Sequence, residues 1–214
     1  MNRDMLALNV MTFPVDRAIV DEFASLPEDG RFSRLSPSKE WNSDIEWISA
    51  ADETTFEVFQ SAFDRLGIAA HAAPYLDIET TVRLYAGFLV VRSRCTETHF
   101  HVDWSETNNE AFTFLTPVGG SAPGFGMLYK RPDESIGEYG YTAGEGIAFG
   151  DKFQHSTQPG ESEQPVVLLC FVYGTDKMQH WPKISRTVGT QVTHLRQPDG
   201  KFTRAAGTAA YVQS

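Results

Sequence analysis

The chain has 214 residues, of which 41% are hydrophobic, and this length favours one domain with a sizeable core. Its formal net charge is −10 and its pI is about 5.0. An acidic surface repels nucleic-acid phosphate and anionic lipid, so we expect neither as a partner and a small molecule as the ligand.

Cysteine usage and apolar content indicate where the protein works. The two cysteines, Cys95 and Cys170, are too few for a disulfide scaffold and favour a reducing compartment. No basic N-terminal segment precedes an apolar run, and no stretch approaches the roughly 20 apolar residues of a membrane span. We therefore expect a cytoplasmic protein without membrane contact, and the oligomeric state stays open.

The first third of the chain has a helical pattern. Apolar residues at helical spacing follow Pro14 and predict an amphipathic helix: Val15, Ile19, Phe23 and Leu26. Residues 27–50 are rich in proline, glycine and polar side chains and are predicted to be loop. A second stripe, made of Phe56, Phe59, Phe63 and Leu66, predicts a core helix that ends at Gly67. Thr54 and Glu57 have the spacing of its capping box.

From about residue 78 the pattern changes to strands. Residues 80–94 are rich in β-branched and aromatic side chains, interrupted only by Gly87, and predict a long strand or a strand pair. Further predicted strands are 99–103, 112–117, 126–130, 146–149 and 165–173. Turn signals separate them at 108–109, 119–126, 137–146 and 159–160. Short strands at this spacing favour an antiparallel sandwich or barrel. The last forty residues are polar and mixed, with a turn at 198–200, and we expect Trp181 to pack back on the barrel.

The residues with the clearest chemistry are His101, Asp103 and His155. His101 and Asp103 are two apart, so on an extended strand they point to the same side. His155 follows a short apolar strand and a Gly-Asp turn, which places it at a strand end. Two imidazoles and one carboxylate can occupy one face of an octahedral metal and leave three positions open, the arrangement of non-haem Fe(II) oxygenases.

This pattern resembles the Fe(II)/2-oxoglutarate-dependent dioxygenases over roughly residues 80–175. The resemblance implies a mainly β fold with flanking helices around a double-stranded β-helix, a jelly-roll core related to the cupin barrel. It also implies Fe(II), 2-oxoglutarate and O2 as cofactor and co-substrates, with His101, Asp103 and His155 as the catalytic metal ligands. We expect a single domain, 1–214, with N-terminal helical support (1–77), the jelly-roll core (78–175) and a C-terminal extension (176–214).

One element of the family pattern is missing. Most members carry an arginine or lysine after the distal histidine, where it holds the far carboxylate of 2-oxoglutarate, but the segment 164–170 contains no cation. A guanidinium suits a carboxylate because it makes two parallel charge-assisted hydrogen bonds. Arg92, Arg94 and Lys130 on nearby strands are candidates. We favour Lys130 and Arg94, helped by Thr116 or Tyr129.

The reaction implied by the resemblance is oxidation of a small metabolite, such as an amino acid or a natural-product intermediate, with hydroxylation as the default outcome. Asp103 argues against halogenation, because a small residue replaces this carboxylate in the halogenating relatives. A cupin-type enzyme that does not use 2-oxoglutarate is an alternative, with the ligands His99, His101, Glu106 and His155. That motif lacks its flanking glycines, since Ser93 and Thr113 stand at those positions. A jelly-roll binding protein without catalysis is the third possibility.

Overall fold

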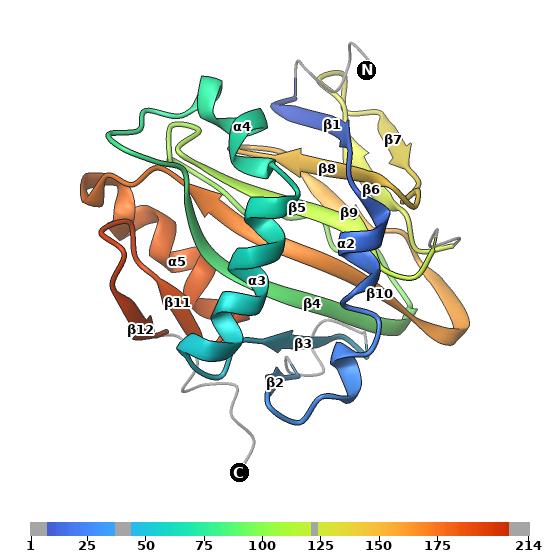
Figure 1. Ribbon diagram of the computed structural model, residues 1–214. Helices are drawn as coiled ribbons and strands as arrows, with labels where there is room; N and C mark the ends of the chain where they lie inside the picture. The colour runs from blue at the N-terminus through green and yellow to red at the C-terminus, as the bar shows by residue number, and fades with distance from the viewer. Residues whose placement is uncertain (1–7, 37–43, 121–123, 206–214) are drawn as a thin grey trace.

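The computed structural model describes residues 8–36, 44–120 and 124–205, and two antiparallel sheets form its centre (Figure 1). The larger sheet has seven strands in the order β1 (Val10–Pro14), β8 (Glu145–Phe149), β5 (Ala111–Pro117), β10 (Gly160–Gly174), β4 (Arg83–Cys95), β3 (Glu46–Ser49) and β2 (Ser33–Leu35). The smaller sheet has the order β7 (Ile136–Tyr139), β6 (Met127–Lys130) and β9 (His155–Thr157). The predicted mainly β core with flanking helices is confirmed.

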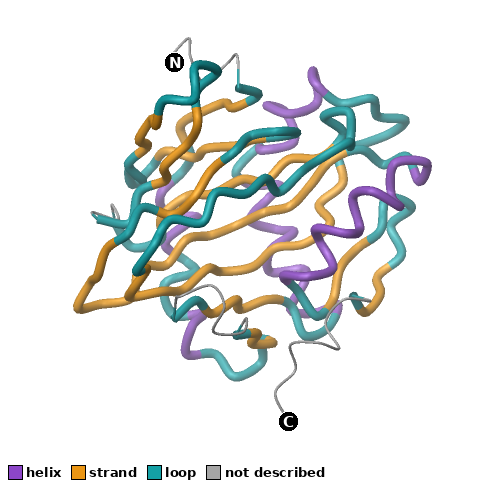
Figure 2. Tube along the Cα trace, turned by 180° about the vertical axis from the view of Figure 1, so that it is seen from behind, coloured by secondary structure: helices purple, strands orange, loops and turns teal. Residues whose placement is uncertain are grey.

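Helices lie on both sides of the larger sheet. In Figure 1, α3 (Glu53–Arg65) crosses the near face, and α5 (Trp181–Gln191) lies on the opposite side, as the reverse view in Figure 2 shows. The short helical elements are α2 (Arg17–Asp21), η1 (Leu26–Glu28), α4 (Ile68–Ala72), η3 (Ala73–Tyr75) and η4 (Met178–His180). A hairpin of β11 (His194–Arg196) and β12 (Phe202–Arg204) follows α5. No described helix has the length and apolar character needed to cross a membrane.

The apolar stripe of α3 packs on the larger sheet as predicted. Phe56, Phe59 and Phe63 are almost completely buried in one core cluster with residues of β4 and β10. Phe59 lies directly over Gly87, where an added Cβ would sit 2.4 Å from the Phe59 Cβ. The glycine in this strand therefore makes room for the helix. The alternate residues of the same strands point into a second cluster between the two sheets and α5.

Both ends of α3 show how the sequence sets its limits. Gly67 has a φ of +67°, in the left-handed region, and the predicted stop at this glycine is confirmed. The predicted cap of Thr54 and Glu57 is wrong. Asp52 is the N-cap, with its side chain accepting from Thr55 N at 2.8 Å, while Thr55 Oγ1 accepts from Asp52 N at 3.0 Å. The capping box therefore begins two residues earlier and uses a threonine in place of a glutamate.

The described part of residues 1–77 contains strands as well as helices. The predicted helix after Pro14 is reduced to α2, and the rest of that segment forms turns and η1. Within 27–50, predicted as loop, β2 and β3 extend the sheet beyond β4, and residues 37–43 lie outside the described chain. Strands of three and four residues are too short to show a period, and backbone pairing with β4 decides their conformation.

Beyond residue 78 the predicted strands 112–117, 126–130 and 146–149 are confirmed with shifts of one residue at their ends. The predicted strand 165–173 lies within the longer β10, which begins at Gly160 and so includes half of the predicted turn 159–160. Residues 99–103 are not a strand, because only a single bridge joins His101 to His155. Strand β7 lies inside the predicted turn 137–146, and α5 occupies part of a tail for which no helix was predicted. The predicted turn at 198–200 is confirmed, since Gly200 N donates to Gln197 O at 2.9 Å between β11 and β12.

Candidate metal centre and its cavity

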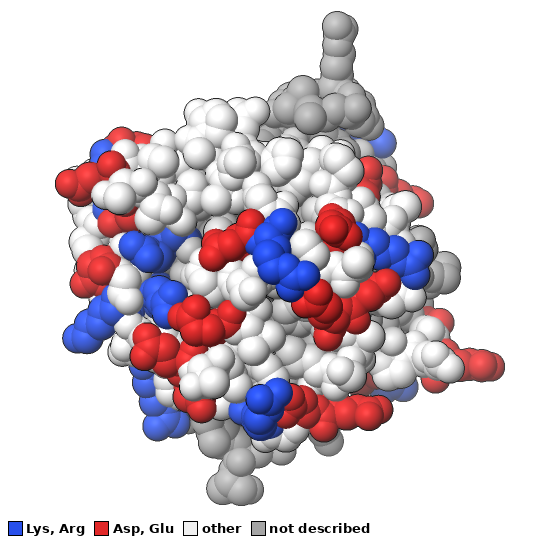
Figure 3. Space-filling view, viewed as in Figure 1, with Lys and Arg blue, Asp and Glu red and all other residues white. Residues whose placement is uncertain are grey.

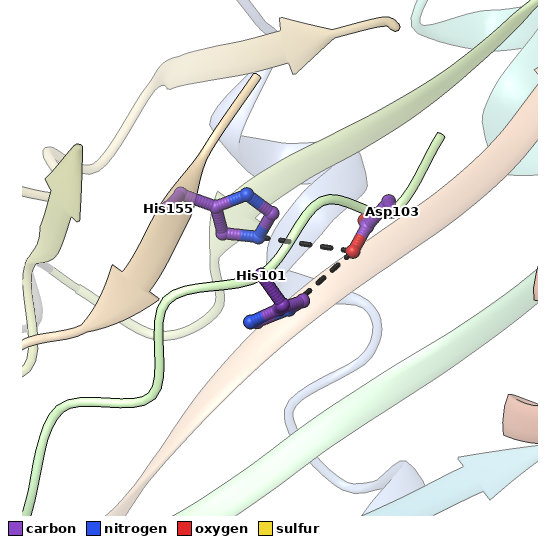
Figure 4. A group of neighbouring side chains, drawn as sticks. All are labelled: His101, Asp103 and His155. Atoms are coloured by element: carbon purple, nitrogen blue, oxygen red, sulfur yellow. Dashed lines mark ion pairs between the residues drawn. The ribbon is translucent and has the colours of Figure 1, made fainter. Parts of the chain in front are cut away.

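The backbone brings His101 and His155 face to face. His101 N donates to His155 O at 2.9 Å, and His155 N donates to His101 O at the same distance. Residues paired in this way project their side chains to the same side of the ladder, and the two imidazole centroids lie 4.5 Å apart. Asp103, two residues beyond His101, turns its carboxylate toward both rings, as Figure 4 shows.

The donor atoms of these three side chains converge. Asp103 Oδ1 lies 3.5 Å from His101 Nε2 and 3.8 Å from His155 Nε2, and the three potential ligand atoms lie within 4.8 Å of one another. Ligand atoms that share one ion at about 2.1 Å, at right angles, are about 3 Å apart. The centre fits a divalent cation after small movements of its side chains.

Backbone contacts also fix the imidazole tautomers. His101 Nδ1 lies 2.9 Å from His99 O, and His155 Nδ1 lies 3.2 Å from Phe153 O. A carbonyl oxygen can only accept a hydrogen bond, so each Nδ1 carries the proton and donates it. In the neutral form of each imidazole, Nε2 then carries the lone pair, on the side of Asp103, which is the form of histidine that binds a metal.

Asp103 is held in position from two sides. Its Oδ2 accepts a hydrogen bond from Thr113 Oγ1 at 2.7 Å, and its carbonyl oxygen accepts from Thr187 Oγ1 at 2.5 Å. Trp104 Nε1 in turn donates to Thr113 Oγ1 at 3.0 Å. These contacts link the ligand segment to strand β5 and to helix α5, and they leave Asp103 Oδ1 to face the histidines.

The electrostatics of the centre favour a charged carboxylate and a neutral distal imidazole. Burial alone would raise the pKa of Asp103, but hydrogen bonds from His101 and Thr113 and the charges of both histidines lower it to about 2. Burial lowers the pKa of His155 below its usual value. Burial acts in the same direction on His101, yet its hydrogen bond with Asp103 raises the net pKa of that imidazole.

The three side chains open into a cavity of about 410 Å³ between the sheets and α5. Both sheets contribute apolar side chains to its walls: Phe88, Val90, Leu115, Met127, Phe149, Val166 and Leu168. The polar side chains in the wall include Arg92, Tyr141 and Thr157 on one side and the α5 residues Arg186, Thr187, Thr190 and Gln191 on another. A mostly apolar cavity with a few polar groups beside a metal centre is typical of a small-molecule site.

The structure does not bring Lys130 or Arg94 to this cavity. Lys130 pairs with Glu134 at 3.3 Å and lies over the ring of Phe100. Arg94 is exposed, and its backbone N–H donates to Asp44. Neither residue is part of the cavity wall.

Thr116 and Tyr129 are also outside the cavity wall. The hydroxyl of Thr116 donates to Glu145 O at 2.9 Å. Tyr129 is buried, and its ring fills the space above Gly137, where an added Cβ would sit 2.3 Å from the Tyr129 Cζ. None of the four residues expected to hold 2-oxoglutarate therefore lines the cavity.

Arg92, the third cation that the sequence offers for 2-oxoglutarate, does line the cavity. Its Nη1 donates to Thr157 Oγ1 at 2.6 Å, whereas its buried Nε has no hydrogen-bond partner. Burial lowers the pKa of this guanidinium, which still stays charged. Arg92 pairs with Val166 across β4 and β10, so it stands beside the segment 164–170 that lacks a cation.

The available signal for Arg92 was the alternation of inward residues along β4. Phe88, Val90 and Arg92 all line the cavity, which follows from the period of two in a strand. Arg94 has the same parity in the sequence, but the pairing of β4 with β10 shifts register between Arg92 and Arg94. Beyond that shift Cys95 lines the cavity and Arg94 is exposed, and the sequence carries no signal for the irregularity. Tyr141, a buried residue whose hydroxyl pKa is raised by burial, was also missed.

Two other candidate ligand sets contain side chains that already have partners in the protein. Glu106, required by the cupin alternative, pairs with Lys183 at 3.7 Å and does not line the cavity. A second acidic group contains Asp77, Glu110 and His180. There Lys177 Nζ already pairs with Asp77, and Glu110 Oε2 accepts the Asp77 N–H at 2.9 Å. We assign that group to the structural junction between β10 and η3.

Comparison with protein-family models gives no match, and comparison with the curated proteins gives none either. Solved structures do match. The non-haem α-ketoglutarate-dependent epimerase SnoN from nogalamycin biosynthesis has a TM-score of 0.65 and 14% identity, with 81% of each chain covered. HygX from Streptomyces hygroscopicus, solved with nickel and 2-oxoglutarate, has a TM-score of 0.59 and 15% identity, covering 82% of this chain and 87% of that one.

A Pseudomonas putida prolyl-4-hydroxylase matches with a TM-score of 0.56 and 13% identity, covering 80% of this chain and 95% of that one. These identities show the fold alone. The chain therefore has the jelly-roll fold of these enzymes, and the predicted fold class is confirmed.

Proposed function

We propose that this protein is an Fe(II)- and 2-oxoglutarate-dependent oxygenase whose metal ligands are His101, Asp103 and His155. The observation that carries the proposal is the convergence of two imidazole Nε2 atoms and one carboxylate oxygen at the wall of a closed-in cavity. This donor set suits Fe(II) and leaves coordination positions open. Solved structures of the same fold support it, since HygX was solved with nickel and 2-oxoglutarate and SnoN with Fe³⁺ and α-ketoglutarate.

We propose Arg92 as the residue that binds the far carboxylate of 2-oxoglutarate. Its guanidinium lies in the cavity, is only partly used by Thr157, and keeps an unpartnered Nε. A buried arginine without an anion leaves hydrogen-bond capacity unused, and a carboxylate supplies the missing acceptors. Tyr141 lines the same cavity and offers a hydroxyl as a second donor.

A bound Fe(II) supplies the redox chemistry that couples O2 and 2-oxoglutarate to oxidation of a substrate. The chain contributes orientation and a dry site. Thr113 keeps Asp103 Oδ1 directed at the ion position, the two carbonyls at His99 and Phe153 keep both Nε2 atoms deprotonated, and the apolar walls exclude water.

We propose a small metabolite as substrate and hydroxylation as the reaction. The neighbours include an epimerase, a carbocyclase and a prolyl-4-hydroxylase, so one fold serves several outcomes. HygX was solved with hygromycin B, which is a small molecule. The two buried cysteines are free, which suits the reducing cytoplasm that we retain as the proposed location.

The test of the function is succinate formation from 2-oxoglutarate with Fe(II) and ascorbate, together with Ni(II) binding measured by calorimetry. We expect the wild type to bind one ion and to turn over 2-oxoglutarate slowly without substrate. Asp103→Ala and His155→Ala should lose both properties, while His99→Ala should keep metal binding. A wild type that binds no divalent ion would exclude the oxygenase.

The test of the co-substrate site compares two arginines of β4. Arg92→Gln should raise the concentration of 2-oxoglutarate needed for half-saturation by about ten- to a hundredfold, the size expected for a lost charge-assisted hydrogen bond. Arg94→Gln, two residues further along the same strand, should leave it unchanged. Equal effects of the two substitutions would contradict the assignment.

A further inference from the structure

Helix α5 presents a polar face to the cavity. Arg186, Thr187, Thr190 and Gln191 belong to the wall, whereas Ile184 and Val188 of the same helix are buried in the core between the sheets. Thr187 donates its hydroxyl to the carbonyl oxygen of Asp103. The polar face of α5 is therefore tied to the metal-ligand segment, on the wall formed by the helix and away from the strand that carries Arg92.

Arg186, an exposed residue, belongs to the half of the described lysines and arginines that have no carboxylate partner. Across the described residues, basic side chains commonly pair with carboxylates: Arg17 with Asp21, Arg34 with Glu46, Arg65 with Glu22, Lys177 with Asp77 and Lys183 with Glu106. Figure 3 shows this interspersed pattern on one face of the molecule. Arg186, by contrast, makes no hydrogen bond or ion pair within the described part of the chain, although it lines the cavity.

An arginine kept at a cavity wall without a carboxylate neighbour is suited to an anion from outside. The chain carries a formal net charge of −10, so an anionic ligand is repelled by most of the surface and needs a local cation to bind. Guanidinium groups bind carboxylate and phosphate in a planar, two-pronged geometry. Thr190 and Gln191, on the same face of α5, offer further hydrogen-bond donors to such a group.

Apolar side chains line the cavity as well, in addition to the polar residues Glu97 and His99. Ile45 and Trp47 line the cavity, and both are 7% exposed. Val102, between the two ligands His101 and Asp103, also lines the cavity and is 39% exposed. A ligand with its charged end at α5 can therefore lay an apolar body along these side chains and beside the metal centre.

We infer that the primary substrate is a small amphipathic acid whose anionic group is bound by Arg186, with its apolar body against Ile45 and Trp47. This inference rests on the proposed function, because it assigns Arg92 to 2-oxoglutarate and leaves Arg186 for the substrate. The anionic group is a carboxylate or a phosphate ester, since one guanidinium serves both.

The test measures binding to protein loaded with Ni(II) and saturating 2-oxoglutarate, by calorimetry. The probes are matched sets that share an apolar body: phenylacetate, phenylacetamide and phenethylamine, together with phenyl phosphate. We expect at least one anion to bind and the amide and amine to bind much more weakly. Preference for phenylacetate or phenyl phosphate then identifies the anionic group.

Variants separate this site from the co-substrate site. Arg186→Gln should weaken binding of the anion by about tenfold. Lys183→Gln removes the same charge from the same helix outside the cavity and should change nothing. Both variants should keep Ni(II) and 2-oxoglutarate binding, which is measured first in every sample. If the wild type binds neither Ni(II) nor 2-oxoglutarate, the proposed function is refuted, independently of Arg186.

Three results would overturn the inference while the proposed function stands. They are failure of both anions to bind the loaded wild type, equal binding by the wild type and Arg186→Gln, and loss of anion binding in Arg92→Gln alone. The last result would show that the probes occupy the site of 2-oxoglutarate.

Discussion

The hydroxyl of Thr113 stands between Trp104 and Asp103: it accepts from the indole Nε1 and donates to Asp103 Oδ2 at 2.7 Å. Trp104 is completely buried, so the residue that starts this series of hydrogen bonds is fixed in the core. In the sequence, Thr113 stands out only as the residue at the position of a cupin glycine. In the structure it determines which carboxylate oxygen of Asp103 faces the histidines.

Substituting Thr113 should weaken metal binding. Thr113→Val removes the donor to Asp103 Oδ2 and lets the carboxylate rotate, so the dissociation constant for Ni(II) should rise about ten- to a hundredfold. Thr113→Ser keeps the hydroxyl and should restore most of the affinity. Calorimetric titration gives both constants, and circular dichroism checks folding. An unchanged dissociation constant for Ni(II) in Thr113→Val would show that Thr113 does not position the metal-binding carboxylate.

Metal binding should stabilise the fold. The ligands come from segments more than fifty residues apart, and the unfolded chain does not hold them together. At a free Ni(II) concentration of a hundred times its dissociation constant, the free energy of unfolding should increase by about 2.7 kcal/mol. Urea unfolding with Ni(II) and with a chelator measures the difference. The same increase in Asp103→Ala would show that the ion binds elsewhere.

Replacing Gly87 should destabilise the protein. An alanine Cβ would lie 2.4 Å from the Phe59 Cβ and 2.5 Å from its Cγ, so the α3 helix must move away from β4. Overpacking of this kind costs about 1–3 kcal/mol of unfolding free energy. Gly30→Ala is the control, because nothing lies within 4 Å of its added Cβ. Similar unfolding midpoints for the two variants would contradict this account of the contact.

Acid should weaken the start of β4 through Asp176. Its carboxylate accepts from three successive backbone N–H groups, those of Glu79, Thr80 and Thr81, at 2.6–2.9 Å. Burial alone would raise the pKa of Asp176, but these hydrogen bonds lower it below the usual 3.8. The stability that the ionised form contributes is therefore complete above pH 3.8 and is lost as the pH falls through the lowered pKa.

Asp176→Asn tests this dependence. The variant should be less stable than the wild type at pH 7, and the difference between the two free energies of unfolding should shrink below about pH 4. Urea titrations at several pH values measure it. A difference that is constant between pH 7 and pH 3 would show that the carboxylate charge has no part.

The main strands and the convergence of His101, Asp103 and His155 could be predicted from the sequence because their signals are local. Apolar runs mark β4, β5 and β10. The two-residue spacing of His101 and Asp103 places both side chains on one side although only a single bridge, and no strand, forms there. Strands β2 and β3 could not be predicted, because they exist through pairing with β4. Helix α5 was missed because Pro182, Gly189 and several threonines lower its helix propensity.

The choice between Arg92 and Arg94 needed three dimensions. The two arginines have the same parity in the sequence, but a register shift between β4 and β10 falls between them, and only Arg92 lines the cavity. Lys130 was a plausible cation by position, yet Glu134 lies four residues away and neutralises it. Local pairing of charges therefore decided which cations remained for ligands.

Arg92 and Val166 are paired across β4 and β10. A side chain from either strand at this pair can therefore reach the same part of the cavity. A search for a cation at a fixed distance in sequence after His155 examines only β10, although β4 also reaches this position of the sheet. Transplanting the guanidinium, with Val166→Arg in an Arg92→Val background, would rebuild the commoner arrangement within the same scaffold. Where one strand of such a pair carries no cation, the residue paired with it across the ladder is the next place to look.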